Sequence, residues 1–281
     1  IYSSLAILGT AVTILIYFSI YGIKTESFND LISNKISEIN PKFSLNINDV
    51  FLKLNAKDRS INIRTQDAEI FIDKEFIKIS RIDLNLNILN FLKKENSIKK
   101  IKITTDKNKI KKFTDFINAY KFSVPRLLIF NQIKDGNITA EIIINFNDKT
   151  ASEFVFDVNT KVRDAKLHIL NEHKVEEINF DLNIKDKIYI VENATFSNKG
   201  INFSSKKIVI ENVNDIYEIE GDLANIKGPI DAKYLKKILN YKINFLDNKN
   251  IIAETKNEFK FKINSKKKIK DLSFRSKVNF E

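Results

Sequence analysis

The segment Val175–Ile184, VEEINFDLNI, decides the fold class because apolar and polar residues alternate along it. Ile178, Phe180, Leu182 and Ile184 occupy every second position, with asparagine and aspartate between them. Successive side chains of a β-strand point to opposite faces, so this segment has one apolar and one wet face. The sequence therefore predicts a mainly β protein built from one-sided strands. The same alternation recurs at Phe43–Ile47, Phe154–Val158, Phe259–Ile263 and Leu272–Phe280.

The composition fits a folded, strand-rich chain. A hydrophobic content of 43% is enough for a core. Only 6 glycines and 3 prolines predict regular ladders joined by short polar turns, and the absence of cysteine excludes disulfides and thiol chemistry. The net charge of +11 would suit anionic lipid headgroups or nucleic acid. A plainer explanation is AT-rich coding, which enriches Ile, Asn and Lys together.

An uncharged stretch, Leu5–Ile23, predicts a single transmembrane anchor. Roughly 19 residues rising ~1.5 Å each span close to the ~30 Å of a bilayer's hydrocarbon core. Tyr2 lies at one end, and Tyr17 and Tyr21 lie at the other, where interfacial aromatic residues are expected. A secretory signal would have a shorter apolar core and a small-residue cleavage site, and neither is present.

Three short amphipathic helices are predicted by apolar residues at helical spacing. They are Ser27–Ile39, Asp106–Tyr120 (capped by Thr105 or Asp106) and Asp231–Tyr241, with a helical turn at Ile88–Lys94. Elsewhere strands dominate, and Asp135-Gly136 is typical of a hairpin turn.

Pro125 marks the expected boundary after the second of these helices. The expected organisation is a transmembrane anchor over residues 1–24, a helix and strand capping region over 25–125, and a repetitive β-region over 126–281. The last region is expected to continue past Glu281, because the sequence stops inside an alternating run.

The strands outnumber the helices that could cover them. The sequence predicts about fifteen strands, and one helix, ~10 Å across, shields about two strands spaced ~4.8 Å apart. Three helices therefore cover roughly six strands. The others either close on themselves as a sandwich or barrel, or leave an open apolar trough. Such a trough would far exceed the apolar patches of soluble monomers and would need an occupant, for which acyl chains are the obvious choice.

The sequence offers no catalytic constellation. His168 and His173 are the only histidines, and their spacing does not suit a metal site. Phosphate-binding, dinucleotide-binding and nucleophile-elbow motifs are absent, so we expect no enzyme, no cofactor and no metal. The lysine clusters do not predict nucleic-acid binding, because the phenylalanines mostly occupy the phase opposite the lysines, as in Phe259–Ile263.

Two segments carry a resemblance to a known family. ILNFLKK (Ile88–Lys94) leads into SIKKIKIT (Ser97–Thr104), and Ile190–Ile230 contains a layered repeat with a GDLAN step. Together with the anchor and the long one-sided meander, they resemble the N-terminal part of the AsmA-like proteins of Gram-negative envelopes, the group that includes TamB and YhdP.

The resemblance implies a single-pass inner-membrane protein with its bulk in the periplasm. Its antiparallel sheet would be rolled into a taco-like groove that conducts phospholipids between the inner and outer membranes. The implied partners are phospholipid, the inner membrane through Leu5–Ile23, and outer-membrane proteins as a further class. The alternative is an anchored β-rich scaffold or assembly factor for envelope proteins. The candidate groove-lining residues are Phe154, Phe156, Val158, Ile178, Phe180, Leu182, Ile184, Phe259, Phe261 and Ile263.

Overall fold

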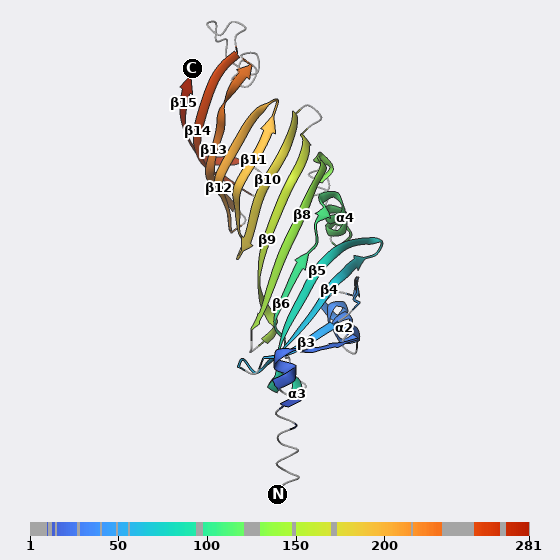
Figure 1. Ribbon diagram of the computed structural model, residues 1–281. Coiled ribbons are helices and arrows are strands. Elements are labelled where there is room, and N and C mark those ends of the chain that lie inside the picture. Colours follow the sequence, from blue (N-terminus) through green and yellow to red (C-terminus); the bar gives the residue numbers. More distant parts are fainter. Residues whose placement is uncertain are drawn as a thin grey trace. The chain divides into compact units, whose positions relative to one another are not determined.

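The computed structural model contains one fifteen-stranded antiparallel sheet with few helices (Figure 1). This confirms the predicted mainly β class and the expected number of strands. The residues that the structure describes are 10, 13–14, 16–26, 29–39, 41–48, 50–55, 57–93, 98–120, 130–147, 150–169, 173–214, 216–231, 250–264 and 268–280.

The chain divides into two compact units. Unit 1 comprises Ile1–Leu127 and Thr139–Val158, and unit 2 comprises Leu128–Ile138 and Asn159–Glu281. Within the described part of the chain, no helix is both long and apolar enough to cross a membrane. Much of the predicted anchor Leu5–Ile23 lies outside that part, and residues 16–20 are helical.

Unit 1 combines strands with the helices α2, α3 and α4, besides the helical residues 16–20. Its elements are β1 (Ile23–Thr25), α2 (Asn29–Ile39), β2 (Phe43–Asn46), β3 (Val50–Asn55), β4 (Ser60–Ile72), β5 (Glu75–Asn87), α3 (Ile88–Leu92), β6 (Ile98–Thr105), β7 (Asn108–Lys109) and α4 (Ile110–Tyr120), with parts of β8 (Ile133–Asn147) and β9 (Thr150–Ile169).

Unit 2 is a meander of long strands, each paired with the next along the chain. Besides the remaining parts of β8 and β9, its strands are β10 (His173–Lys185), β11 (Ile188–Asn198), β12 (Ile201–Val213), β13 (Ile216–Asp231), β14 (Asn250–Ile263) and β15 (Ile269–Phe280). The path through the whole sheet is β1-β3-β4-β5-β6-β8-β9-β10-β11-β12-β13-β14-β15, with β2 paired to β4 and β7 paired to β8.

The core of unit 1 lies between its sheet and two helices. Ile32 of α2 and Phe116 of α4 belong to one buried cluster with the inward residues of β3 to β6. Phe43 stacks on both Phe116 and Tyr120, with ring centroids 6.2 and 5.5 Å apart. The apolar stripes of α2 and α4 therefore cover the apolar face of this part of the sheet, as amphipathic helices do.

Helix α4 begins later than the sequence predicts. The cap at Thr105 or Asp106 is wrong, since the helix starts at Ile110. The Asn108 carboxamide accepts the Lys78 backbone N–H and donates to the Lys78 carbonyl, both at 3.0 Å. This pair of bonds holds Asn108–Lys109 as strand β7 and delays the helix.

At two other places the structure has a strand where the sequence predicts a turn or a helix. Asp135-Gly136 is not a hairpin turn, because β8 runs straight through it. Gly136 has a φ of 135°, a conformation that glycine adopts without steric cost, so the strand absorbs the irregularity there. Asp231, the expected first residue of the third helix, ends β13 instead. The rest of that predicted helix lies outside the described residues.

Candidate functional site

One face of unit 2 carries two continuous rows of apolar side chains. Residues paired directly across antiparallel strands point to the same face, so the pairing register defines each row. We call the residues of these two rows the apolar face of unit 2. The first row is Leu182, Val191, Ile208, Gly221, Phe259 and Phe274, one residue from each strand from β10 to β15. The second row is Ile184, Tyr189, Ile210, Ile219 and Phe261, from β10 to β14.

The side chains of the apolar face of unit 2 are incompletely buried. Those from β10 to β14 are partly buried, and Phe274 on β15 is 63% exposed. Exposure is also high at two other apolar residues of β15, Ile269 at 61% and Leu272 at 67%. A contiguous apolar surface that stays open to solvent is uncommon on a soluble monomer and usually marks an interaction site.

Unit 1 provides an internal comparison. Its corresponding row is Leu52, Ile63, Leu84, Ile101 and Ile144, which pair across β3, β4, β5, β6 and β8. The three central members are only 1%, 6% and 7% exposed. Because α2 and α4 pack on that face, the same strand chemistry produces a dry core there. The helices α2, α3 and α4 all belong to unit 1, and the only helical residues described in unit 2 are 130–132.

Gly221 is the one residue of the first row without a side chain, and atoms of β12 occupy the space that a side chain would need. A Cβ atom at this position would lie 2.9 Å from Ile208 Cγ1 and 2.9 Å from the Lys207 carbonyl oxygen. Glycine therefore permits the close approach of β12 to β13 beside an irregularity in β12.

The opposite face of unit 2 is charged and largely self-neutralised. Lys260 pairs with Glu220 at 3.0 Å, and Lys262 pairs with Glu218 at 3.1 Å. In each pair the hydrogen bond to the carboxylate raises the pKa of the lysine ammonium. On β9 and β10, Arg163 pairs with Asp181 at 2.5 Å, and this bond lowers the pKa of the Asp181 carboxyl.

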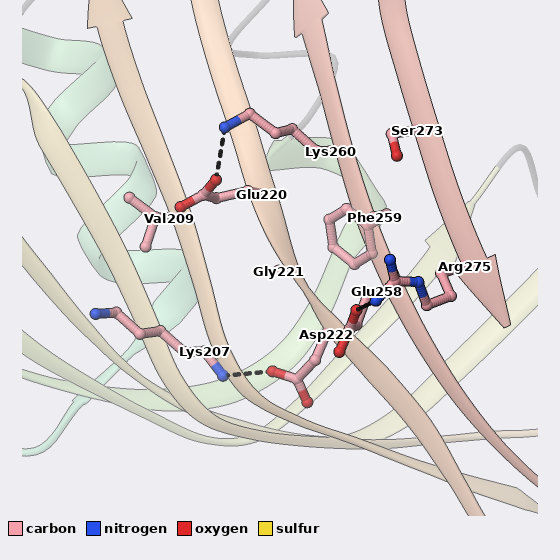
Figure 2. Close-up of a pocket in the computed structure, with 10 residues that line it drawn as sticks. All are labelled: Lys207, Val209, Glu220, Gly221, Asp222, Glu258, Phe259, Lys260, Ser273 and Arg275. Atoms are coloured by element: carbon pink, nitrogen blue, oxygen red, sulfur yellow. Dashed lines mark hydrogen bonds and ion pairs between the residues drawn. The ribbon is translucent and has the colours of Figure 1, made fainter. Parts of the chain in front are cut away.

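A depression of about 440 Å³ is lined mainly by residues of this charged face, together with Gly221 and Phe259 of the first row (Figure 2). Three cations, Lys207, Lys260 and Arg275, share it with three carboxylates, Glu220, Asp222 and Glu258.

The Asp222 carboxylate has a structural role in this depression. It accepts the backbone N–H groups of Lys206 and Lys207 at 2.9 to 3.1 Å, as Figure 2 shows for Lys207. Both donors lie in the bulge of β12, where the ladder bonds to β13 are interrupted. The carboxylate thereby satisfies groups that the ladder leaves unpaired.

Seven of the ten predicted lining residues lie on β10 and β14 in unit 2. Cross-strand pairing through β11, β12 and β13 connects Leu182 to Phe259 and Ile184 to Phe261. These four residues therefore lie on one face of the sheet. Ile178 and Phe180 follow on β10, and Ile263 follows on β14; all three are partly buried.

The other three predicted lining residues belong to unit 1. They lie on β9, where Phe156 is 48% exposed and Val158 is partly buried. The side chain of Phe154 lies outside the described residues. Val155, which points to the opposite face, is 49% exposed, so this end of β9 exposes apolar groups on both faces.

The sequence does not predict the residues in the middle of the apolar face of unit 2, on β11, β12 and β13. Tyr189, Val191, Ile208, Ile210 and Ile219 join the two predicted segments into continuous rows. Their alternation is visible in the sequence, but a bulge at Asn193 (φ 53°) shifts the phase of β11. Counting every second residue along the sequence therefore does not show which residues of β10 and β14 share a face.

Among the described residues, β15 lies at one end of the strand order, with β14 as its ladder partner. The strand at the other end, β1, is three residues long.

No group of His, Cys, Asp or Glu side chains among the described residues is arranged to hold a metal ion. No family model, no curated protein and no solved structure matches this chain.

Proposed function

We propose that this chain is a membrane-anchored protein whose apolar face in unit 2 binds the acyl chains of phospholipids and conducts them between the inner and outer membranes of a Gram-negative envelope. Leu5–Ile23 would anchor it in the inner membrane as a single span, with the bulk in the periplasm. One observation carries the proposal: the rows of unit 2 remain partly open to solvent, whereas the three central residues of the equivalent row of unit 1 are buried.

The dimensions of the rows suit an acyl chain. The first row crosses six strands, which spans about 24 Å at ~4.8 Å per strand. One leaflet of a bilayer contributes about 15 Å of hydrocarbon, half of the ~30 Å core. The length of the row is therefore comparable with that of one acyl chain.

The chemistry of the rows suits transfer rather than permanent storage. Burying a methylene releases about 0.8 kcal/mol, and a chain lying on an open sheet buries only one side of each methylene. The apolar face of unit 2 presents similar aliphatic and aromatic groups from strand to strand, so a bound chain loses little when it moves from one row to the next. The polar headgroup would stay in water.

The test is lipid analysis of the full chain purified in mild detergent. We expect native mass spectrometry and lipid extraction to find phospholipid on the parent protein and on Ser273→Asp, and to find it largely lost from Phe274→Asp. The two residues are neighbours on β15, but Ser273 pairs with Lys260 on the charged face and Phe274 pairs with Phe259 on the apolar face. The same amount of lipid on all three proteins would refute the proposal.

A transfer assay separates binding from conduction. The parent chain should accelerate the movement of fluorescent phospholipid from donor to acceptor vesicles, and Phe274→Asp should not. Lipid binding without acceleration would limit the function to lipid holding.

The second candidate is an anchored scaffold that pairs a strand from an envelope client with the last described strand, β15. This function requires the backbone of Ile269–Phe280 rather than its apolar side chains. Proline at a position of β15 whose N–H points away from β14 would remove an outer backbone donor and should abolish client capture. Lipid occupancy that survives this change while client binding is lost would assign both roles to different parts of unit 2.

A further inference from the structure

A second depression, on the polar face of unit 1, is strongly cationic. It has a volume of about 470 Å³ and is lined by five cations, Lys53, Arg64, Arg81, Lys100 and Lys102, and by one carboxylate, Asp83. The depression of unit 2 described above holds three of each sign. The excess of positive charge therefore distinguishes the depression of unit 1 from that of unit 2. We call the depression of unit 1 the basic depression.

Ion pairing within the basic depression leaves two lysines available. Asp83 is shared by Arg64 at 2.6 Å and Arg81 at 2.8 Å, and Lys102 pairs with Glu141 at 2.8 Å. Lys53 and Lys100 are exposed, and neither has an ion pair or hydrogen bond within the described part of the chain. Such a field of unneutralised cations in a concave surface concentrates anions.

The floor between these two lysines offers a hydrogen-bond donor. Lys53, Asn62, Asn85 and Lys100 form one cross-strand row over β3 to β6. Asn85 donates to Asn62 Oδ1 at 2.7 Å, so the carbonyl of Asn62 is used and its amide N–H₂ group remains to donate. Two flanking ammonium groups and a central amide match the acceptor oxygens of a phosphate group.

The position of the basic depression in unit 1 indicates the source of the phosphate. Strand β1 pairs with β3, which aligns Lys24 with Phe51 and, through Phe51, with Arg64. A neighbouring depression of about 410 Å³ contains Lys24 and shares Phe51 and Arg64 with the basic depression. Lys24 follows directly on the apolar stretch Leu5–Ile23. If that stretch is inserted in a bilayer, the basic row starts at the level of the lipid headgroups.

We infer that the basic depression binds the phosphate group of an anionic phospholipid at the surface of the membrane that holds the chain. The inference rests on the proposed membrane anchor but not on lipid conduction by unit 2. A cationic side chain near an anionic membrane surface strengthens binding about fivefold. Loss of both free lysines should therefore weaken binding by about 25-fold.

The experiment is calorimetric titration of the full chain, in neutral detergent, with three probes: dihexanoyl phosphatidylglycerol, dihexanoyl phosphatidylcholine and inorganic phosphate. We expect the anionic lipid to bind at least tenfold more tightly than the zwitterionic lipid, and to weaken as salt is raised. The double variant Lys53→Gln/Lys100→Gln should lose about 25-fold in affinity for the anionic lipid, and Lys53→Arg/Lys100→Arg should retain it.

The matched control is Lys207→Gln/Arg275→Gln, which removes two cations from the balanced depression of unit 2 and should leave the titration unchanged. Circular dichroism melting shows whether each variant is folded; both lysines are exposed, so no large change is expected. Equal binding of the two lipids, or unchanged affinity in the glutamine variant, would overturn the inference. Inorganic phosphate binding as tightly as the anionic lipid would assign the site to free phosphate instead.

Failure of this inference and failure of the proposed function are separable. Phe274→Asp should abolish lipid transfer and leave the preference for the anionic over the zwitterionic lipid unchanged. Flotation of the full chain with vesicles of pure phosphatidylcholine tests the anchor alone, because those vesicles offer no net negative charge. A chain that does not float with them would remove the positional argument for a lipid headgroup.

Discussion

Placing one carboxylate in the apolar row of each unit should destabilise the fold to very different extents. We compare Ile63→Asp in the row of unit 1 with Phe261→Asp in the row of unit 2. Ile63 is 1% exposed and lies in a cluster closed by α2 and α4. Phe261 is partly buried, pairs with Ile219 and contacts the Phe259 ring at a centroid distance of 6.0 Å.

The expected free energies differ widely. Removing the Ile63 side chain costs about 2 to 5 kcal/mol, and an unpaired buried carboxylate adds several more. The sum is comparable with the total stability of about 5 to 15 kcal/mol of a typical domain, so unit 1 should unfold. At Phe261 the shorter carboxylate can still reach water, and the loss should be about 1 to 3 kcal/mol.

At Phe261 the substitution should weaken lipid binding more strongly than it weakens folding. An acyl chain over the row would cover the new carboxylate, and desolvating it costs several kcal/mol. Because 2.7 kcal/mol corresponds to about 100-fold in affinity, lipid occupancy should fall at least that far.

Urea unfolding followed by circular dichroism and extracted lipid phosphorus per mole of protein measure the two quantities. Equal destabilisation by Ile63→Asp and Phe261→Asp would mean that the apolar face of unit 2 is as dry as that of unit 1. The apolar face of unit 2 would then not be open to a lipid.

Three further predictions concern residues that stabilise the strands of unit 2. Gly221→Ala should destabilise the protein by about 1 to 3 kcal/mol in urea titrations, since its Cβ would meet backbone and Ile208; a neutral result would mean that β12 shifts freely. Asp222→Ala should raise amide hydrogen exchange at the bulge of β12, and unchanged exchange would show that water replaces the carboxylate. Arg163 lowers the pKa of Asp181, so this pair stabilises the fold above the unfolded pKa of about 3.9 and loses its effect as the pH falls through the folded pKa. The parent should therefore exceed Asp181→Asn in unfolding free energy at pH 7 and lose that advantage in strong acid; a constant difference between pH 7 and 2 would contradict this.

The strand class and most strand positions could be predicted because period-two alternation is local. Leu182 and Phe261 read as members of an apolar phase without any knowledge of their neighbours. The register that places them on one face could not be read, because it depends on bulges. Asp164, Glu177, Asn193 and Asp271 all have positive φ inside strands, and none of them is glycine. Aspartate and asparagine tolerate this conformation, but they are equally common in turns.

The basic depression could not be predicted from the sequence either. The cluster of Lys99, Lys100 and Lys102 is visible in the sequence, but the residues of other strands that lie beside it are not. Lys100 meets Lys53 and the Asn62–Asn85 pair only through the order of β3 to β6. The start of helix α4 predicted from the sequence is too early, because the hydrogen bonds between Asn108 and Lys78 outweigh the local capping preference.

The order of strands in unit 2, each paired with the next along the chain, also affects how the protein can assemble and change in length. Contacts between neighbouring hairpins are local in sequence, so the sheet can form progressively from one hairpin to the next without closing long loops. Deleting or duplicating two consecutive strands restores the up-and-down alternation and reconnects the rows on either side. A protein of this construction can be shortened or extended by whole hairpins, in the way that repeat proteins gain and lose modules.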